Sequence, residues 1–100
     1  MSLLAFSPSL TVQQVLSTTQ VNITVGGFGH YLRFVNMATG NAFVQFYEAS
    51  VTPPTVTSTN GMVLMPGAIE IFSVASDTTK VAALGDATGT TLSITRGEGQ

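Results

Sequence analysis

Apolar and polar residues alternate along most of this chain with a period of two, in short runs that recur about every ten residues. The clearest run covers residues 20–25, where Val21, Ile23 and Val25 alternate with polar neighbours. This alternation is typical of a strand with one buried face and one wet face. No segment has apolar residues at helical spacing opposite charged ones. The pattern therefore predicts an all-β chain.

Clusters of Gly, Pro, Asn and Asp separate eight such runs, and we expect a strand in each of them. The expected strands are residues 11–16, 20–25, 31–36, 42–47, 62–65, 68–74, 79–84 and 91–95. The short connection over residues 38–41 predicts that the third and fourth strands form a hairpin. About eight short antiparallel strands in one chain predict a small β-sandwich, a jelly roll or a closed barrel.

A length of 100 residues indicates a single domain. We expect its body over residues 11–96 and a polar tail over residues 97–100. Residues 1–10 are expected to form an N-terminal extended arm, since Leu3, Leu4 and Phe6 are apolar and precede Pro8. This segment either pairs as an edge strand or extends onto a neighbouring subunit. It has neither the basic start nor the long apolar run of a signal peptide.

Charge is scarce, and this narrows the function classes. Charged residues make up 8% of the chain, against about 25% in an ordinary domain, and the net charge is −2. Only three residues are basic, which argues against nucleic acid or an anionic membrane surface as the partner. Cysteine is absent, so disulfides and thiolate sites are excluded within these residues. The low charge indicates either a chain that normally associates or simply a Thr-rich β domain.

Some strands carry more apolar surface than one core requires. In residues 42–47, Val44 and Phe46 lie on one face while Phe43 and Tyr47 lie on the other. The runs 62–65 and 81–84 are likewise apolar on both faces. The second face has to be covered by the connection 48–61, by a terminus or by another subunit, because exposed apolar side chains favour association. The candidate partner contacts are Leu3, Leu4, Phe6, Phe43, Tyr47, Pro53 and Pro54.

The residues that carry chemistry are few and scattered. His30 is the sole histidine, whereas a metal centre of the His type needs two or three nitrogen ligands. The five carboxylates show no paired or clustered spacing, so neither a glycosidase pair nor a calcium loop is indicated. The glycine-rich segment 26–29 lacks the Lys-Ser/Thr of a phosphate loop and is predicted to be a hairpin turn. We therefore expect no enzyme activity, no catalytic residue, no metal and no cofactor.

Several short segments together resemble small structural proteins of tailed bacteriophages, of the head decoration or capsid cementing type. They are Arg33-Phe-Val-Asn36, Ala42-Phe-Val-Gln-Phe46, Met65-Pro-Gly-Ala-Ile-Glu-Ile-Phe72, Val81-Ala-Ala-Leu84 and Leu92-Ser-Ile-Thr-Arg-Gly-Glu-Gly99. The resemblance spans roughly residues 20–99. It implies a β-sandwich or jelly-roll domain without catalytic residues, made in the host cytoplasm and located on the capsid surface of the virion. The implied partner is the major capsid protein, whose neighbouring subunits it would bridge, and the implied state is a dimer or trimer.

The alternative is a receptor- or carbohydrate-binding β module of a phage tail or fibre. Such a module needs an exposed aromatic or polar pocket, and Tyr31, Tyr47 and His30 are the candidates for it. A small hydrolase would require His30 to lie beside a serine and an acid, and no nucleophile-elbow pattern is present.

Overall fold

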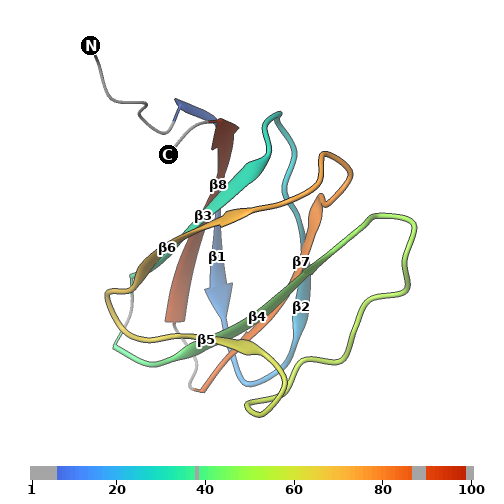
Figure 1. Ribbon diagram of the computed structural model, residues 1–100. Coiled ribbons are helices and arrows are strands. Elements are labelled where there is room, and N and C mark those ends of the chain that lie inside the picture. Colours follow the sequence, from blue (N-terminus) through green and yellow to red (C-terminus); the bar gives the residue numbers. More distant parts are fainter. Residues whose placement is uncertain (1–6, 38, 87–89, 99–100) are drawn as a thin grey trace.

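The computed structural model describes residues 7–37, 39–86 and 90–98, and they form eight strands and no helix. The strands are β1 (Ser7–Leu16), β2 (Val21–Thr24), β3 (Tyr31–Asn36), β4 (Ala42–Tyr47), β5 (Met62–Leu64), β6 (Ile69–Ser73), β7 (Lys80–Gly85) and β8 (Thr90–Glu98). They build two four-stranded antiparallel sheets (Figure 1). The expected all-β sandwich of about eight short strands is confirmed.

The strand order identifies the sandwich as a jelly roll. Sheet A has the order β1-β8-β3-β6 and sheet B the order β2-β7-β4-β5. The pairs β1–β8, β2–β7, β3–β6 and β4–β5 are all antiparallel, so the chain follows the path of one long hairpin that is rolled into two layers. In the described part of the chain, no helix is present that could cross a membrane.

The expected hairpin between the third and fourth strands is wrong. Both strands have the predicted bounds, but β3 belongs to sheet A and β4 to sheet B. The chain crosses between the layers at this connection, and the buried side chain of Asn36 holds the crossing. Its Nδ2 donates to the carbonyls of Gly40 and Leu64, each at 2.8 Å. A short connection can join two strands of one sheet or cross between the two sheets. Its length alone therefore does not determine which strand pairs with β3.

The core lies between the sheets and is built from the inward residues of both. Buried aliphatic side chains from seven strands contribute to it, and three phenylalanines pack together at one side. The ring centroids of Phe34, Phe46 and Phe72 lie 5.7 to 6.3 Å apart. These distances are in the range preferred by packed aromatic pairs.

The last strand, β8, continues to Glu98, two residues beyond the end expected for the body of the domain. Arg96, with 1% of its surface exposed, is the largest fully buried side chain. Its guanidinium donates to the backbone carbonyls of Gly29, Thr78, Ala75 and Ser76. A charged residue near a terminus is ordinarily a surface residue, but here it joins β8 to two turns.

Of the segment expected as an N-terminal arm, residues 7–10 pair as part of an edge strand, which is one of the two alternatives considered for it. Residues 7–10 extend β1, where Ser7 pairs with Glu98 and Leu10 with Arg96. The pairing is possible because β8 itself extends further than the sequence indicated. Residues 1–6, with Leu3, Leu4 and Phe6, lie outside the described residues.

Glycine occupies positive-φ positions in two turns, and the hairpin turn expected over residues 26–29 is wrong. Pro66 and Gly67 form a turn closed by the N–H of Ala68 and the C=O of Met65 at 2.9 Å, with φ +77° at Gly67. The turn over residues 26–29 links β2 to β3 across the layers, so it is a crossing rather than a hairpin. A side chain at Gly29, where φ is +121°, would overlap the carbonyl of Gly97.

Candidate functional site

The outer face of sheet B is covered by the long loop between β4 and β5. Val56 from this loop is buried together with Phe43 of β4 and Ala82 of β7, and Tyr47 and Leu84 pack against them. Only 8% of Phe43 remains exposed. For β4 and β7, the second apolar face is therefore covered by the chain's own loop, whereas Val63 and Met65 in the run 62–65 stay exposed.

The loop is fastened by the side-chain amide of Gln20, directly before β2. Its Nε2 donates to the carbonyl of Pro54 at 2.8 Å, and its Oε1 accepts the N–H of Val56 at 2.7 Å. The amide therefore pairs with the loop backbone as a neighbouring strand would. Further along the loop, the Asn60 amide makes two more hydrogen bonds to loop backbone groups. Several specific bonds hold this cover in place over β4 and β7, while Val63 of the edge strand β5 stays 47% exposed.

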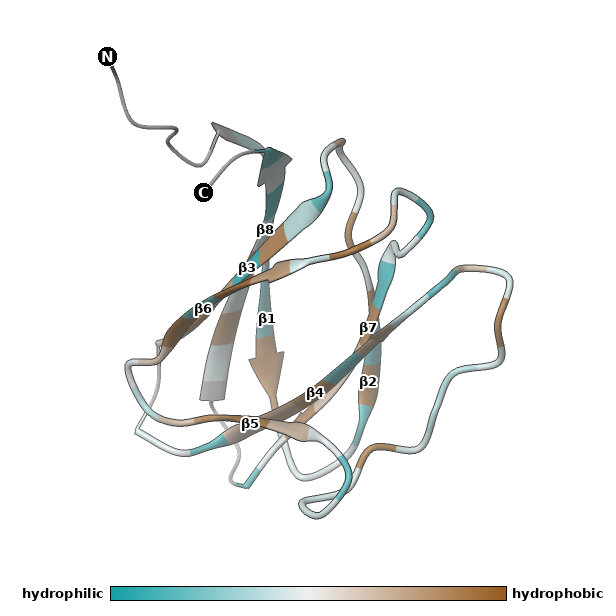
Figure 2. Cartoon of the chain, in the orientation of Figure 1, coloured by the Kyte–Doolittle hydropathy of each residue, from teal (hydrophilic) through white to brown (hydrophobic). Residues whose placement is uncertain are grey.

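The outer face of sheet A has no comparable cover in the part of the chain that the structure describes. On β3 and β6, the register places Arg33 beside Ile71 and Val35 beside Ile69. Ile69 is 56% exposed and Ile71 39%. We call these four residues the Arg33 patch. Much of β6 is coloured as hydrophobic in Figure 2, although it is an edge strand.

The other half of the same face is polar. The outward residues of β1 and β8 are mainly hydroxyl and amide side chains: Thr11, Gln13, Ser93 and Thr95. Thr11 and Thr95 share a hydrogen bond of 2.9 Å across the two strands. The face is thus divided lengthwise into a polar half and an apolar half, and the apolar half ends at the open edge.

The open edge of β6 adds unused backbone groups beside the apolar side chains. The N–H of Val74 and the C=O of Ala68 both bond to the β3 side. Because antiparallel strands pair through alternate residues, the backbone groups of Ile69 and Ile71 point away from β3. Such an edge can pair with a strand from another protein. The Arg33 patch therefore combines apolar side chains with a backbone that can accept a partner.

Arg33 is the basic side chain that this surface offers to a partner. Arg96 is buried, and Lys80 Nζ donates to Thr24 Oγ1 at 2.7 Å. Arg33 is half-buried, and within the described residues its guanidinium has no hydrogen bond or ion pair. A lone charge therefore lies beside the exposed isoleucines, between Ile71 on β6 and the polar Thr95 on β8.

The predicted contact residues do not gather on this patch. Phe43 and Tyr47 lie in sheet B under the loop, Pro53 is exposed on that loop, and Pro54 is held by Gln20. The Arg33 patch is not among the strands that the sequence analysis identified as apolar on both faces. The signal that could have found it is the pair Ile69 and Ile71, which alternate with Glu70 and Phe72 and so put apolar residues on the face opposite Phe72.

The candidates for chemistry are also separated. His30 Nδ1 lies 3.2 Å from Glu98 Oε2, and both side chains are well exposed. Among the described residues no serine is hydrogen-bonded to His30, and no cluster of His, Cys, Asp or Glu could hold a metal ion. Tyr31 lies in sheet A and Tyr47 in sheet B, so the two tyrosines do not form one platform for a sugar.

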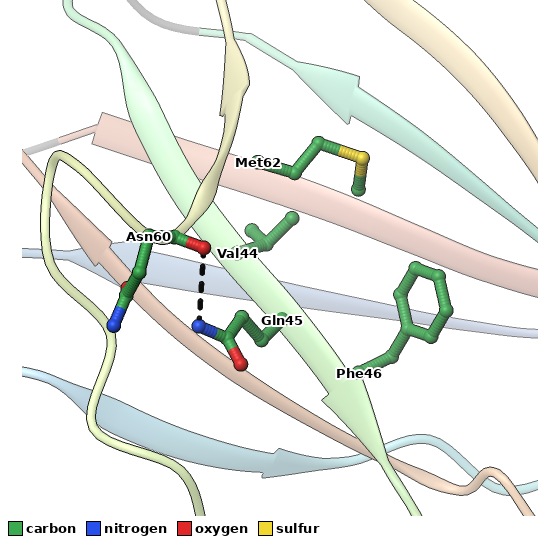
Figure 3. Close-up of a pocket in the computed structure, with 5 residues that line it drawn as sticks. All are labelled: Val44, Gln45, Phe46, Asn60 and Met62. Atoms are coloured by element: carbon green, nitrogen blue, oxygen red, sulfur yellow. Dashed lines mark hydrogen bonds between the residues drawn. The ribbon is translucent and has the colours of Figure 1, made fainter.

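A recess of about 260 Å³ opens beside β4, where the three-residue β5 leaves it uncovered (Figure 3). Val44, Phe46 and Met62 line its apolar side. Gln45 and Asn60 line the rest, with a hydrogen bond of 3.2 Å from Gln45 Nε2 to the Asn60 carbonyl. The volume is below the usual range of small-molecule sites, and its lining includes no acid or base. The recess can accept an apolar group but cannot transfer a proton.

Comparisons with known proteins support the fold. No family model matches the chain, and no curated protein matches it. A solved structure from work titled "Bacillus endospore appendages form a novel family of disulfide-linked pili" is similar, with a TM-score of 0.53 and 17% identity. The match covers 96% of this chain and 89% of that one. At this identity the likeness concerns the fold alone, and the absence of cysteine here means that these 100 residues cannot form such disulfides.

Proposed function

We propose that this chain is a structural protein without catalytic activity, which binds other protein subunits of a multi-copy assembly through the outer face of sheet A. The observation that carries the proposal is the bare Arg33 patch. The chain covers β4 and β7 on the equivalent face of sheet B with its own loop and leaves Val63 of the edge strand exposed there, whereas on sheet A two neighbouring isoleucines, Ile69 and Ile71, remain exposed beside Arg33.

The energetics favour a covered patch. Full burial of an aliphatic side chain stabilises by about 1.5–3 kcal/mol. Covering the three partly exposed aliphatic side chains of the patch would therefore stabilise a complex by a few kcal/mol. With 8% charged residues and a net charge of −2, the surface provides little repulsion to keep copies or partners apart. Each contact would still be small, and such contacts gain strength when they repeat on a regular lattice.

In its specific form, the proposal is that the chain decorates the outside of a bacteriophage capsid and bridges neighbouring subunits of the major capsid protein. The resemblance of residues 20–99 to head decoration proteins supports this form. A jelly roll with one bare face also suits it, because a decorating protein needs one side for the shell and one for the solvent.

A second candidate is a subunit of a fibre made from copies of this chain. The fold likeness to a protein described as forming pili favours it. The two forms differ in what occupies the Arg33 patch: a capsid subunit in the first, and another copy in the second.

One pair of variants tests the use of this face. Ile71→Arg places a charge in the Arg33 patch, and Val63→Arg places one at an exposed apolar position of sheet B. We expect Ile71→Arg to abolish incorporation into the assembly and Val63→Arg to retain it. Both variants should show the same thermal unfolding as each other, because both positions are partly exposed.

Copy number then separates the two forms. Quantitative mass spectrometry of purified particles from the virus that encodes the chain should find hundreds of copies for a capsid decoration protein. Electron microscopy of the purified chain alone should show filaments for the fibre form. Equal incorporation of the Ile71→Arg and Val63→Arg variants would refute the proposal that sheet A is the binding face.

A further inference from the structure

We infer that the Arg33 patch binds the Glu48–Val51 turn of a second copy of this chain, with an ion pair between Arg33 and Glu48. The inference rests on the proposed function of the outer face of sheet A and names its partner. It follows from the charge of Arg33 beside the apolar residues of the patch and from the chemistry of that turn.

The lone guanidinium restricts what can cover the patch. A purely apolar partner would remove water from Arg33 and leave the charge without a hydrogen-bond acceptor, which is unfavourable. Two copies that met face to face through this patch would bring their Arg33 side chains close together, and like charges repel. The partner surface must therefore carry an acceptor, best a carboxylate, next to apolar atoms that cover Ile69 and Ile71.

The acids of the chain are not equally suited to that role. Glu98 already pairs with His30, and Glu70 alternates with Ile69 and Ile71 on β6, so it lies on the face of sheet A opposite the patch. Asp77 and Asp86 have short side chains and lie in turns at the ends of β7. Glu48 remains as an exposed acid that, within the described chain, makes no side-chain bond.

The turn that follows β4 brings an apolar side chain next to this acid. The N–H of Val51 donates to the carbonyl of Glu48 at 3.1 Å, which closes a tight turn over these residues. Val51 is 50% exposed. A carboxylate and a bare aliphatic group thus project from the same short turn, which matches the pairing of Arg33 with Ile69 and Ile71 on the patch.

The two surfaces lie on different layers of one molecule. Arg33 belongs to sheet A, and Glu48 follows the end of β4 in sheet B. In Figure 1 the loop after β4 lies beyond β7 and β2, on the opposite side of the view from β6. Each copy therefore offers a patch to one neighbour and a turn to another. Such a contact is heterologous and builds a ring or an open chain of subunits.

A charge exchange tests the pairing directly. Sedimentation velocity at rising protein concentration and low salt should show self-association of the wild-type chain. Arg33→Glu and Glu48→Lys should each weaken it at least about tenfold, because each opposes like charges across the contact. The double variant, which keeps the net charge of −2, should recover it. Salt at about 0.5 M should weaken the wild-type contact, since exposed ion pairs are screened.

Matched controls separate the pairing from net charge. Lys80→Glu changes the net charge as Arg33→Glu does, and Asp86→Lys changes it as Glu48→Lys does. Both controls should associate like the wild type. A double variant that fails to recover, or controls that weaken association equally, would overturn the pairing.

The outcome for the proposed function is distinct. If the wild-type chain stays monomeric at all concentrations but Ile71→Arg still abolishes incorporation into the assembly, the second copy is the wrong partner and sheet A remains the binding face. If Ile71→Arg is incorporated normally, the binding face itself is wrong.

Discussion

Arg96 should be among the most sensitive positions for stability. Its guanidinium donates four hydrogen bonds to backbone carbonyls and joins β8 to the turns around residues 29 and 75–78. In the described structure no carboxylate pairs with it. Arg96→Met keeps much of the side-chain length but removes every one of these donors.

The loss of stability depends on which of the four carbonyls remain inaccessible to water in the variant. The bonds to Gly29 and Thr78 are buried, whereas those to Ala75 and Ser76 are partly accessible, so water can replace the latter pair. A buried acceptor left without a donor costs about 1–3 kcal/mol, which gives about 2–6 kcal/mol for two. Removing a desolvated charge offsets part of this, so we expect Arg96→Met to lower the free energy of unfolding by about 3 kcal/mol.

Urea unfolding followed by circular dichroism measures this change, with the slope of the free energy against urea compared between variants. Arg96→Lys should be no more stable than Arg96→Met, because an ammonium keeps the buried charge but cannot span four carbonyls. A loss below about 1 kcal/mol with an unchanged slope would refute the reasoning, since two dry carbonyls alone exceed that value. So would an Arg96→Lys variant as stable as the wild type.

Further variants test the loop and the glycine turns. Gln20→Ala should release the loop over residues 48–61, with a loss of about 1–3 kcal/mol from two hydrogen bonds and faster proteolysis in that loop. Unchanged proteolysis would mean that Val56 alone holds the loop. Gly29→Ala should prevent folding, since a side chain there overlaps the Gly97 carbonyl, whereas Gly67→Ala should cost only about 1–2 kcal/mol because nothing lies near it. Equal losses at both glycines, measured by thermal unfolding, would contradict the close approach seen at Gly29.

The alternation of apolar and polar side chains is sufficient to predict most of the strands. The bounds of β3 and β4 match the expected strands, because these segments alternate cleanly and end at turn residues. The Pro66–Gly67 turn follows from local chemistry, since proline fixes one dihedral angle and glycine permits the positive one. The absence of histidine pairs, cysteines and clustered acids from the sequence likewise limits the chemistry that these residues can perform.

The partner of each surface, in contrast, does not follow from the sequence pattern. Periodicity shows that a strand has a buried and an exposed face, but not which sheet the strand joins. The short connection after β3 therefore predicted a hairpin with β4, although the two strands lie in opposite sheets. The burial of Arg96 depends on four carbonyls from segments about 20 and 67 residues away, which no local pattern records. For the same reason the sequence does not show that Val56 covers Phe43, or that Ile69 and Ile71 stay exposed in the described chain. Local sequence determined the strands and turns, because these depend on dihedral preferences and side-chain alternation. Only the tertiary structure decided which face is bare, because burial depends on contacts between residues distant in the chain.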